Sequence, residues 1–356
     1  MSYTNGLDDP SAYFQATLYT GNGGTNAITN TGNSDLQPDW IWFKRRDGAD
    51  NHIVFDVVRG VTKAIYPDLD NLEDTLSNSL SSFNSDGFTL GADTASGGSI
   101  NGSSETCVAW QWKAGTSVSG TTTGSGTGKA YTGSVNTDAG FSIIRYLGNS
   151  SAGHTIPHNL GAVPKMIIGH GLTGSDTTSW TVYHQSLGAT KTVSLNERAA
   201  ASTSTVWNNT TPTSSVVSLG SSGNVNDNDD AFILYSFAEK QGYSKISSYV
   251  GNGNADGTFV YTGFKPAWLM AFHTTAGNEN WMLVDNKRDG FNVENEQLFP
   301  NTNIAEESND EVDLLSNGFK LRRANTRMNG SGATYIFMAF AENPFVASNF
   351  VTTTAR

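Results

Sequence analysis

Tyr19-Thr20-Gly21-Asn22, Tyr146-Leu147-Gly148-Asn149 and Tyr249-Val250-Gly251-Asn252 are three copies of one Tyr-x-Gly-Asn step in a chain of 356 residues. A Pro that opens an apolar run follows each step 17 to 19 residues later. Each copy closes on an aromatic segment, so that the first Tyr and the last aromatic stand 93, 91 and 91 residues apart. This constant interval indicates three diverged copies of one unit. The three repeats share no set of catalytic residues, which favours a structural or binding role over catalysis at a single site.

The pattern inside each unit is typical of a β protein. Short runs of Val, Ile, Phe, Tyr, Trp and Thr alternate with Gly, Asn, Asp and Ser, and such runs predict strands and turns. Asp86-Gly87 and Asn317-Gly318 are hairpin signals. One stretch, Asp68 to Leu76, has Leu at helical spacing and predicts a short helix. We therefore expect an all-β fold of three related β-sandwich modules of about 90 to 100 residues, with jelly-roll or lectin-like topology.

The repeat and the composition divide the chain into six segments. They are an N-terminal arm (1–10), a first module (11–114), a Gly/Ser/Thr-rich linker (115–139), a second module (140–241), a third module (242–345) and a C-terminal tail (346–356). The linker offers almost no apolar surface, so it is expected to be a flexible tether. The second and third modules follow each other without slack and are expected to pack rigidly. The arm and the tail are expected to dock on a partner.

Composition narrows the classes of partner. The formal net charge is −12, whereas nucleic-acid binding requires a concentrated Lys/Arg face, so no nucleic-acid partner is expected. Only 15% of the residues are charged, and solubility must come from Ser, Thr, Asn and Gly. The single Cys107 is expected to be a buried thiol. No signal-peptide h-region or long apolar run is present. These features predict synthesis in a cytosol, no membrane insertion and an exterior-style surface.

Several stretches resemble a family of virion structural proteins of tailed phages from marine and freshwater bacteria, including cyanophage-like members. The similarity covers nearly the whole chain, and the stretches that carry it include Leu7 to Phe14, Leu18 to Gly23, Pro38 to Lys44, Asp56 to Gly60, Phe83 to Leu90, Trp110 to Gly115, Ala231 to Glu239, Gly251 to Phe264, Ser316 to Leu321 and Tyr335 to Phe345. The segment Thr155 to Lys165 is also similar to the His-x-Leu-Gly-x-x-Pro signature of phage tail-fibre modules. Members of this family are described as virion structural, tail-fibre-like or lectin-like.

This resemblance implies a non-enzymatic protein located on the virion. A tail-fibre or receptor-binding role in host attachment is the expected function. The alternatives are a capsid decoration or head-fibre protein and a polysaccharide-degrading tail spike. Expected partners are other virion proteins, further copies of this chain in a homotrimer, and a glycan or receptor on the host surface.

Acidic and histidine residues are the candidates for a metal site. The loop from Asn224 to Asp230 carries Asp227, Asp229 and Asp230, whose oxygens suit Ca²⁺, although the loop lacks the Gly and Glu of an EF-hand. A polar turn is the other interpretation, and no further cofactor is expected. His154 and His158 flank Pro157, where a helix is unfavourable. His158 is therefore expected to stabilise a turn by bonding backbone groups.

Catalytic candidates are weak, and one aromatic loop is a candidate for binding. Asp56 and Asp285 hold equivalent places, but the second copy has His184 there and no second acid accompanies them. This pattern indicates a turn cap, because glycoside hydrolysis needs two facing carboxylates. Trp207, Asn208 and Asn209 lie outside the repeat strands in a polar loop. Two interpretations are open: Trp207 fills a local packing site, or these residues stack on a sugar or anchor a neighbouring subunit.

Overall fold

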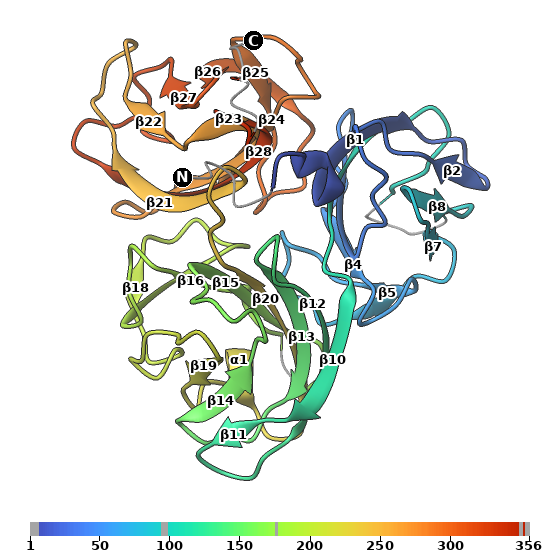
Figure 1. Cartoon of the computed structure of the whole chain (residues 1–356), viewed down its shortest axis with the longest axis vertical. Helices are drawn as coiled ribbons and strands as arrows, with labels where there is room; N and C mark the ends of the chain where they lie inside the picture. The colour runs from blue at the N-terminus through green and yellow to red at the C-terminus, as the bar shows by residue number, and fades with distance from the viewer. Residues whose placement is uncertain (1–6, 94–98, 175–176, 349–351, 353–356) are drawn as a thin grey trace.

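The computed structural model describes residues 7–93, 99–174, 177–348 and 352. The chain folds into antiparallel β-sheets, so the expected all-β class is confirmed. Helix in the described residues is limited to the single turn η1 (Pro10–Ala12) and the four-residue α1 (Gly223–Asn226). Figure 1 shows three lobes around a common centre, one for each repeat.

Each repeat contributes four strands in one fixed order. The strand that precedes Gly-Asn lies beside the closing aromatic strand, which lies beside the Pro-led strand and then the second apolar run. The orders are β1 (Phe14–Thr20), β9 (Thr106–Trp112), β3 (Trp40–Arg45) and β4 (Ile53–Asp56); β13 (Phe141–Leu147), β20 (Ala231–Phe237), β15 (Met166–Gly171) and β16 (Thr181–His184); and β21 (Ser244–Val250), β28 (Thr334–Pro344), β23 (Phe264–His273) and β24 (Met282–Asp285). The sequence repeat is therefore a repeat of strand order.

Further sheets of two to four strands accompany these strands. They are β2 (Asn26–Ile28), β8 (Phe88–Leu90) and β7 (Leu80–Phe83); β11 (Thr123–Gly124), β14 (His154–Pro157) and β19 (Val216–Leu219); β22 (Phe259–Tyr261), β27 (Gly318–Leu321), β26 (Glu307–Leu315) and β25 (Glu294–Gln297); and the pair β5 (Lys63–Ala64) and β6 (Asp74–Thr75). Both expected hairpin turns lie in these sheets, between β7 and β8 and between β26 and β27.

The expected flexible linker is part of the largest sheet. β10 (Thr116–Thr121) pairs with β12 (Ala130–Asn136), which pairs along the outer edge of β13; β17 (Lys191–Ser194) and β18 (Ser202–Thr203) extend the far side. Composition misled the prediction because the ladder satisfies the backbone of this segment. Tyr131 and Val135 also bury apolar surface against the second repeat, which offsets the ordering entropy.

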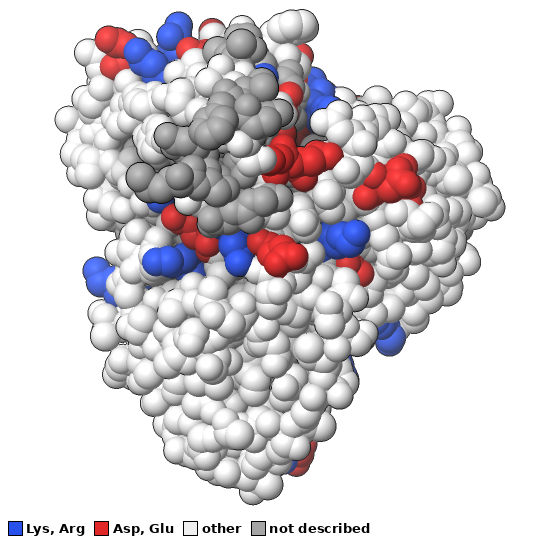
Figure 2. Space-filling view, viewed as in Figure 1, with Lys and Arg blue, Asp and Glu red and all other residues white. Residues whose placement is uncertain are grey.

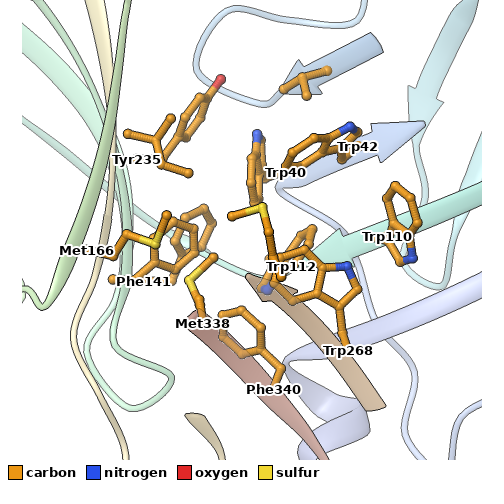
Figure 3. Packing of buried hydrophobic residues seen from close by; sticks show 14 of the residues in the cluster. Trp40, Trp42, Trp110, Trp112, Phe141, Met166, Tyr235, Trp268, Met338 and Phe340 are labelled. Carbon is orange, nitrogen blue, oxygen red and sulfur yellow. The ribbon is translucent and has the colours of Figure 1, made fainter. Parts of the chain in front are cut away.

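One central hydrophobic cluster joins all three repeats. It contains the Pro-led and closing strands of each repeat, and separate clusters lie beneath the outer sheets. The equivalent closing aromatics meet there: Phe340 lies 5.6 Å from Trp112 and 6.0 Å from Phe237 between ring centroids. Figure 3 shows Trp40 beside Tyr235, with ring centroids 4.9 Å apart. The first repeat is thus packed into the shared core and is not loosely tethered.

Other expectations divide into those that held and one that was wrong. The thiol of Cys107 is buried, as expected. Seven tryptophans in or next to strands are also buried: Trp40, Trp42, Trp110, Trp112, Trp180, Trp268 and Trp281. The helix expected from Asp68 to Leu76 does not form. Asp74–Thr75 instead pairs with β5 as β6, and Asp68 Oδ1 accepts the backbone amide of His52 at 3.0 Å. Tertiary contacts here override a weak local periodicity.

The described parts of the two ends lie against the body. Leu7 is buried in the central cluster, and Asp8 Oδ1 accepts the backbone amide of Ser348 at 2.9 Å. Residues 1–6, 349–351 and 353–356 of the expected arm and tail lie outside the described residues.

Candidate functional site

The Tyr-x-Gly-Asn step forms the same latch in all three repeats. The Tyr hydroxyl donates to a backbone carbonyl, from Tyr19 to Ile100 at 2.7 Å, from Tyr146 to Val225 at 2.5 Å and from Tyr249 to Met328 at 2.9 Å. Burial raises the pKa of each of these phenols well above the ordinary value, so they remain protonated donors.

A buried Asn completes each latch. Asn101, Asn226 and Asn329 follow the accepting carbonyls and are fully buried. Their side-chain oxygens accept the backbone amides of Asn22, Asn149 and Asn252 at 3.1, 3.0 and 2.9 Å. A Cβ on Gly21, Gly148 or Gly251 would collide with the backbone around these residues. The shared motif therefore has a structural role in this fold.

Two of the three contacts between repeats are built on buried ion pairs. Asp56 pairs with Arg59 at 2.6 Å and accepts the hydroxyl of Tyr235 from the second repeat at 2.7 Å. Asp285 pairs with Arg288 at 2.6 Å and accepts the indole N–H of Trp110 from the first repeat at 2.9 Å. All four ionic side chains are fully buried. Each carboxylate also accepts backbone amides two and three residues further on, as expected for a turn cap.

The third contact is neutral at the equivalent positions. His184 replaces the Asp, Leu187 the Arg, and Met338 of the third repeat replaces the donor that Tyr235 or Trp110 supplies. His184 Nδ1 accepts the amide of Ser186 at 3.1 Å, and Nε2 lies 3.3 Å from the carbonyl of Phe337. Burial lowers the pKa of His184 to about 4. Where the partner cannot donate a hydrogen bond, the acid and its Arg are both absent.

A backbone hydrogen bond closes all three contacts in one cyclic sense. Glu73 donates to Leu172 at 3.2 Å, Ala201 to Thr274 at 3.0 Å and Glu306 to Arg46 at 2.8 Å. These bonds run from the first repeat to the second, the second to the third and the third to the first. One chain thus forms a pseudo-threefold ring, and this ring accounts for the buried acids that sequence patterns singled out.

The expected contact loop does not present its tryptophan. Trp207 is fully buried and packs against Tyr183, with ring centroids 6.0 Å apart. Asn208 is half-buried and donates to Ser218 at 3.1 Å, and Asn209 is exposed. The stacking interpretation of Trp207 is therefore wrong and the packing interpretation is right, since the ring fills the core of the second repeat. It lies beneath a turn in which Asn208 and Asn209 have positive φ.

The acidic loop and the histidines have ordinary structural partners. Asp229 pairs with Lys129, and hydrogen bonding to that Lys lowers the pKa of Asp229. His154 bonds Asn226 and Thr122, and His158 contacts the carbonyl of Thr213 at 3.1 Å and accepts the amide of Leu160, as expected for a turn. Within the described part of the chain, Asp227, Asp229 and Asp230 join no group of three or more potential ligands arranged to hold a metal ion.

The third repeat carries a hollow of about 720 Å³ beside β21 and β22. Its described lining includes Glu239, Gln241, Lys245 and Tyr261. Glu239 Oε1 pairs with Lys245 at 3.0 Å, and its Oε2 accepts the amide of Ile246 at 3.1 Å. This ion pair fixes the wall of the hollow along the edge strand.

Three exposed apolar residues, called the apolar stripe below, lie on β21 and β22, the two strands that border the hollow, and Tyr261 among them lines it. Val250, Phe259 and Tyr261 are 55, 46 and 59% exposed. The strand register matches Phe259 with Ala27 and Thr155, and Tyr261 with Thr29 and Pro157. Only the third repeat thus has aromatic residues at these two outward-facing positions. Sequence reasoning missed this difference, which becomes visible once the strands are in register.

The other two repeats cover the same place with their own chain. In the first repeat, Gln15 is buried and bonds Gly32 and Ser34 of the connection after β2. In the second, the equivalent Ser142 is buried, and β12 pairs along its strand with Val135 opposite Ser142. In the third, the connection between β22 and β23 is only residues 262–263, and the Lys245 side chain is 33% exposed. The hollow therefore exists because the third repeat lacks the segment that covers the equivalent place in the other two repeats.

Charge is unevenly distributed over the face seen in Figure 2. Lys, Arg, Asp and Glu gather on the upper lobes, while the lobe of the second repeat is largely uncharged on this face. No helix in the described ranges has the length and apolar character needed to cross a membrane.

Fold and contacts together define an all-β protein in which three sequence repeats share one core. The chain belongs to the family described as a domain of unknown function, DUF7483, which matches residues 9–344. No curated protein and no solved structure shows significant similarity to it.

Proposed function

We propose that this chain is a non-enzymatic structural protein of a tailed-phage particle, exposed on the virion and used for host attachment in a tail-fibre role. The observation that carries the proposal is the hollow of the third repeat with its stripe of Val250, Phe259 and Tyr261. Proteins commonly place a variable binding surface on a rigid, buried framework, and exposed apolar patches often mark such surfaces. The sequence resemblance to phage virion proteins supplies the setting.

The finer architecture belongs to the same proposal. Each repeat is a sandwich-like module in which its four shared strands face the common core and a second sheet covers their other side. Three such modules around one centre also suit a threefold position, which favours capsid decoration as the second candidate. One chain or a homotrimer could then occupy that position.

The hollow also bears on the tail-spike alternative. Glycoside hydrolysis requires two carboxylates about 5 to 10 Å apart across a sugar. Glu239 is the one carboxylate in the described lining, and Lys245 neutralises it. This arrangement supports binding over cleavage.

Labelling of purified particles tests the proposal. Antibodies against this chain should decorate the tail in electron micrographs, and the purified protein should reduce adsorption of the phage to host cells. Label on the capsid would favour decoration. Absence of peptides from this chain in mass spectra of purified virions would overturn a virion role.

A further inference from the structure

We infer that the hollow of the third repeat is a binding site for a neutral saccharide, which stacks on Tyr261 and hydrogen-bonds to the wall around Gln241 and the Glu239–Lys245 pair. This inference deepens the proposed attachment role and rests on it for its biological meaning. The binding chemistry itself stands on the residues of the hollow.

Tyr261 is held as a platform. A Cβ added at Gly263 would lie 3.5 Å from the Tyr261 hydroxyl and 3.7 Å from its ring carbon Cε1, so the ring lies against the backbone at this glycine. Gly263 has φ of 84°, a conformation that favours glycine. With one side backed by the chain, the other side of the ring faces outward. An aromatic face of this kind packs against apolar C–H groups and costs little conformational entropy on binding.

The polar groups of the hollow suit hydroxyls better than net charge. Glu239 and Lys245 neutralise each other, and Gln241 is exposed with an amide that both donates and accepts. A charged ligand would have to compete with the existing ion pair. A pyranose ring offers C–H groups to Tyr261 on one face and hydroxyls to the amide, carboxylate and ammonium groups around its edge.

Size favours a small ligand over a protein partner. The volume of about 720 Å³ lies within the roughly 300 to 1,000 Å³ of typical small-ligand sites. A stable protein interface buries about 800 Å² on each partner, whereas the apolar stripe consists of three side chains. The edge of β21 is also partly closed to an added strand, because Glu239 and Gln185 already bond the backbone of Ile246.

Saturation-transfer NMR with neutral tri- and tetrasaccharides of glucose, galactose, mannose and N-acetylglucosamine tests the inference. At least one should bind the full-length protein, with the strongest transfer on one sugar face. Tyr261→Ala should weaken that affinity by roughly tenfold or more, and Tyr261→Phe should retain it. Phe291→Ala, which removes an aromatic residue 76% exposed at another site, is the matched control and should change nothing.

Two outcomes would overturn the inference. One is the absence of binding by every saccharide in the panel; the other is equal binding by the wild type and by a Tyr261→Ala protein whose Tm is unchanged. Failure of the attachment role has a different signature. A protein that binds saccharide through Tyr261 but is missing from virions would retain the site and refute the proposed function.

Discussion

The contacts that the first repeat makes with its two neighbours differ from the contact between the second and third repeats. The former place Asp–Arg pairs in the core, each completed by a hydrogen bond from Tyr235 or Trp110 of the adjacent repeat. The latter uses His184 and Leu187 against Met338. The same strand order therefore supports two chemistries at one position.

The difference shows that the buried Asp, its Arg and the hydrogen-bond donor of the neighbouring repeat occur together, and these three residues are called a charged set below. A buried carboxylate is tolerated only when its desolvation is offset by a cation and further hydrogen bonds. Burial opposes ionisation of Glu306, yet hydrogen bonds and charge from Arg46 and Arg288 hold its pKa below the ordinary value. At the neutral contact, Ala201 occupies the position of Glu306 and Glu73. Acid, base and donor are lost together, and the ring still closes through its backbone hydrogen bonds.

Breaking one charged set gives the largest expected effect. Asp56→Leu leaves the guanidinium of Arg59 buried without its main partner and the Tyr235 hydroxyl without its acceptor. The free energy of unfolding should fall by about 3 to 5 kcal/mol, measured by guanidinium denaturation.

Transplanting the neutral set is the control for that loss. The combined variant Tyr235→Met, Asp56→His and Arg59→Leu reproduces the chemistry of the second and third repeats, while Glu73 retains Lys63 at 3.5 Å. It should be more stable than Asp56→Leu alone. If the triple variant loses the full sum of three single losses, the residues do not act as a set.

Acid should weaken the neutral contact through His184, and His170 at the contact of the first and second repeats, whose pKa burial also lowers to about 4, should act in the same direction. Burial lowers the folded-state pKa of His184 to about 4 from an ordinary 6.5. The unfolded chain therefore binds the extra proton between these values, and stability falls as pH drops from 6.5 to 4. The loss should be on the order of 3 kcal/mol. The depressed pKa of Glu306 places its own loss at lower pH, below about 4.5.

His184→Gln isolates this effect, because Gln keeps a donor and an acceptor but does not titrate. The difference in free energy of unfolding between wild type and variant should change between pH 6.5 and 4. A difference that is constant across this window would show that His184 is not a source of the acid sensitivity.

The latches should respond alike in all three repeats, in contrast to the contacts. Replacing Asn101, Asn226 or Asn329 by Ala removes the buried acceptor of one loop amide and leaves the carbonyls of Gly24, Gly220 or Asn254 without their donor. Each substitution should cost about 1 to 3 kcal/mol, measured by thermal unfolding. If the three substitutions lower stability by widely different amounts, the latch does not have the same role in the three repeats.

Sequence patterns were sufficient for the strands and insufficient for the contacts between repeats. Alternation and turn residues predicted the all-β class and the hairpins at Asp86-Gly87 and Asn317-Gly318. The prediction of a flexible linker was wrong because Gly, Ser and Thr form strand hydrogen bonds as well as other residues do when an edge strand such as β13 is available. The binding role considered for Trp207 was wrong because a loop of polar residues can cover a buried aromatic ring. The sequence analysis did not find the charged contacts, because Asp285 and Trp110 are 175 positions apart in the chain. One signal was present: His184, Leu187 and Met338 together replace the acid, the Arg and the hydrogen-bond donor at the equivalent positions.

The smallest effect is expected where an ion pair is exposed. Asp229 lies at the surface with Lys129, and water screens such pairs far more than the buried Asp56–Arg59 pair. Asp229→Ala should leave Tm unchanged, and addition of EDTA should leave it unchanged in both proteins. A fall in Tm with EDTA that is abolished by Asp229→Ala would instead establish a Ca²⁺ site in this loop. It would also show that an exposed acid can stabilise this fold by a route that the buried sets do not use.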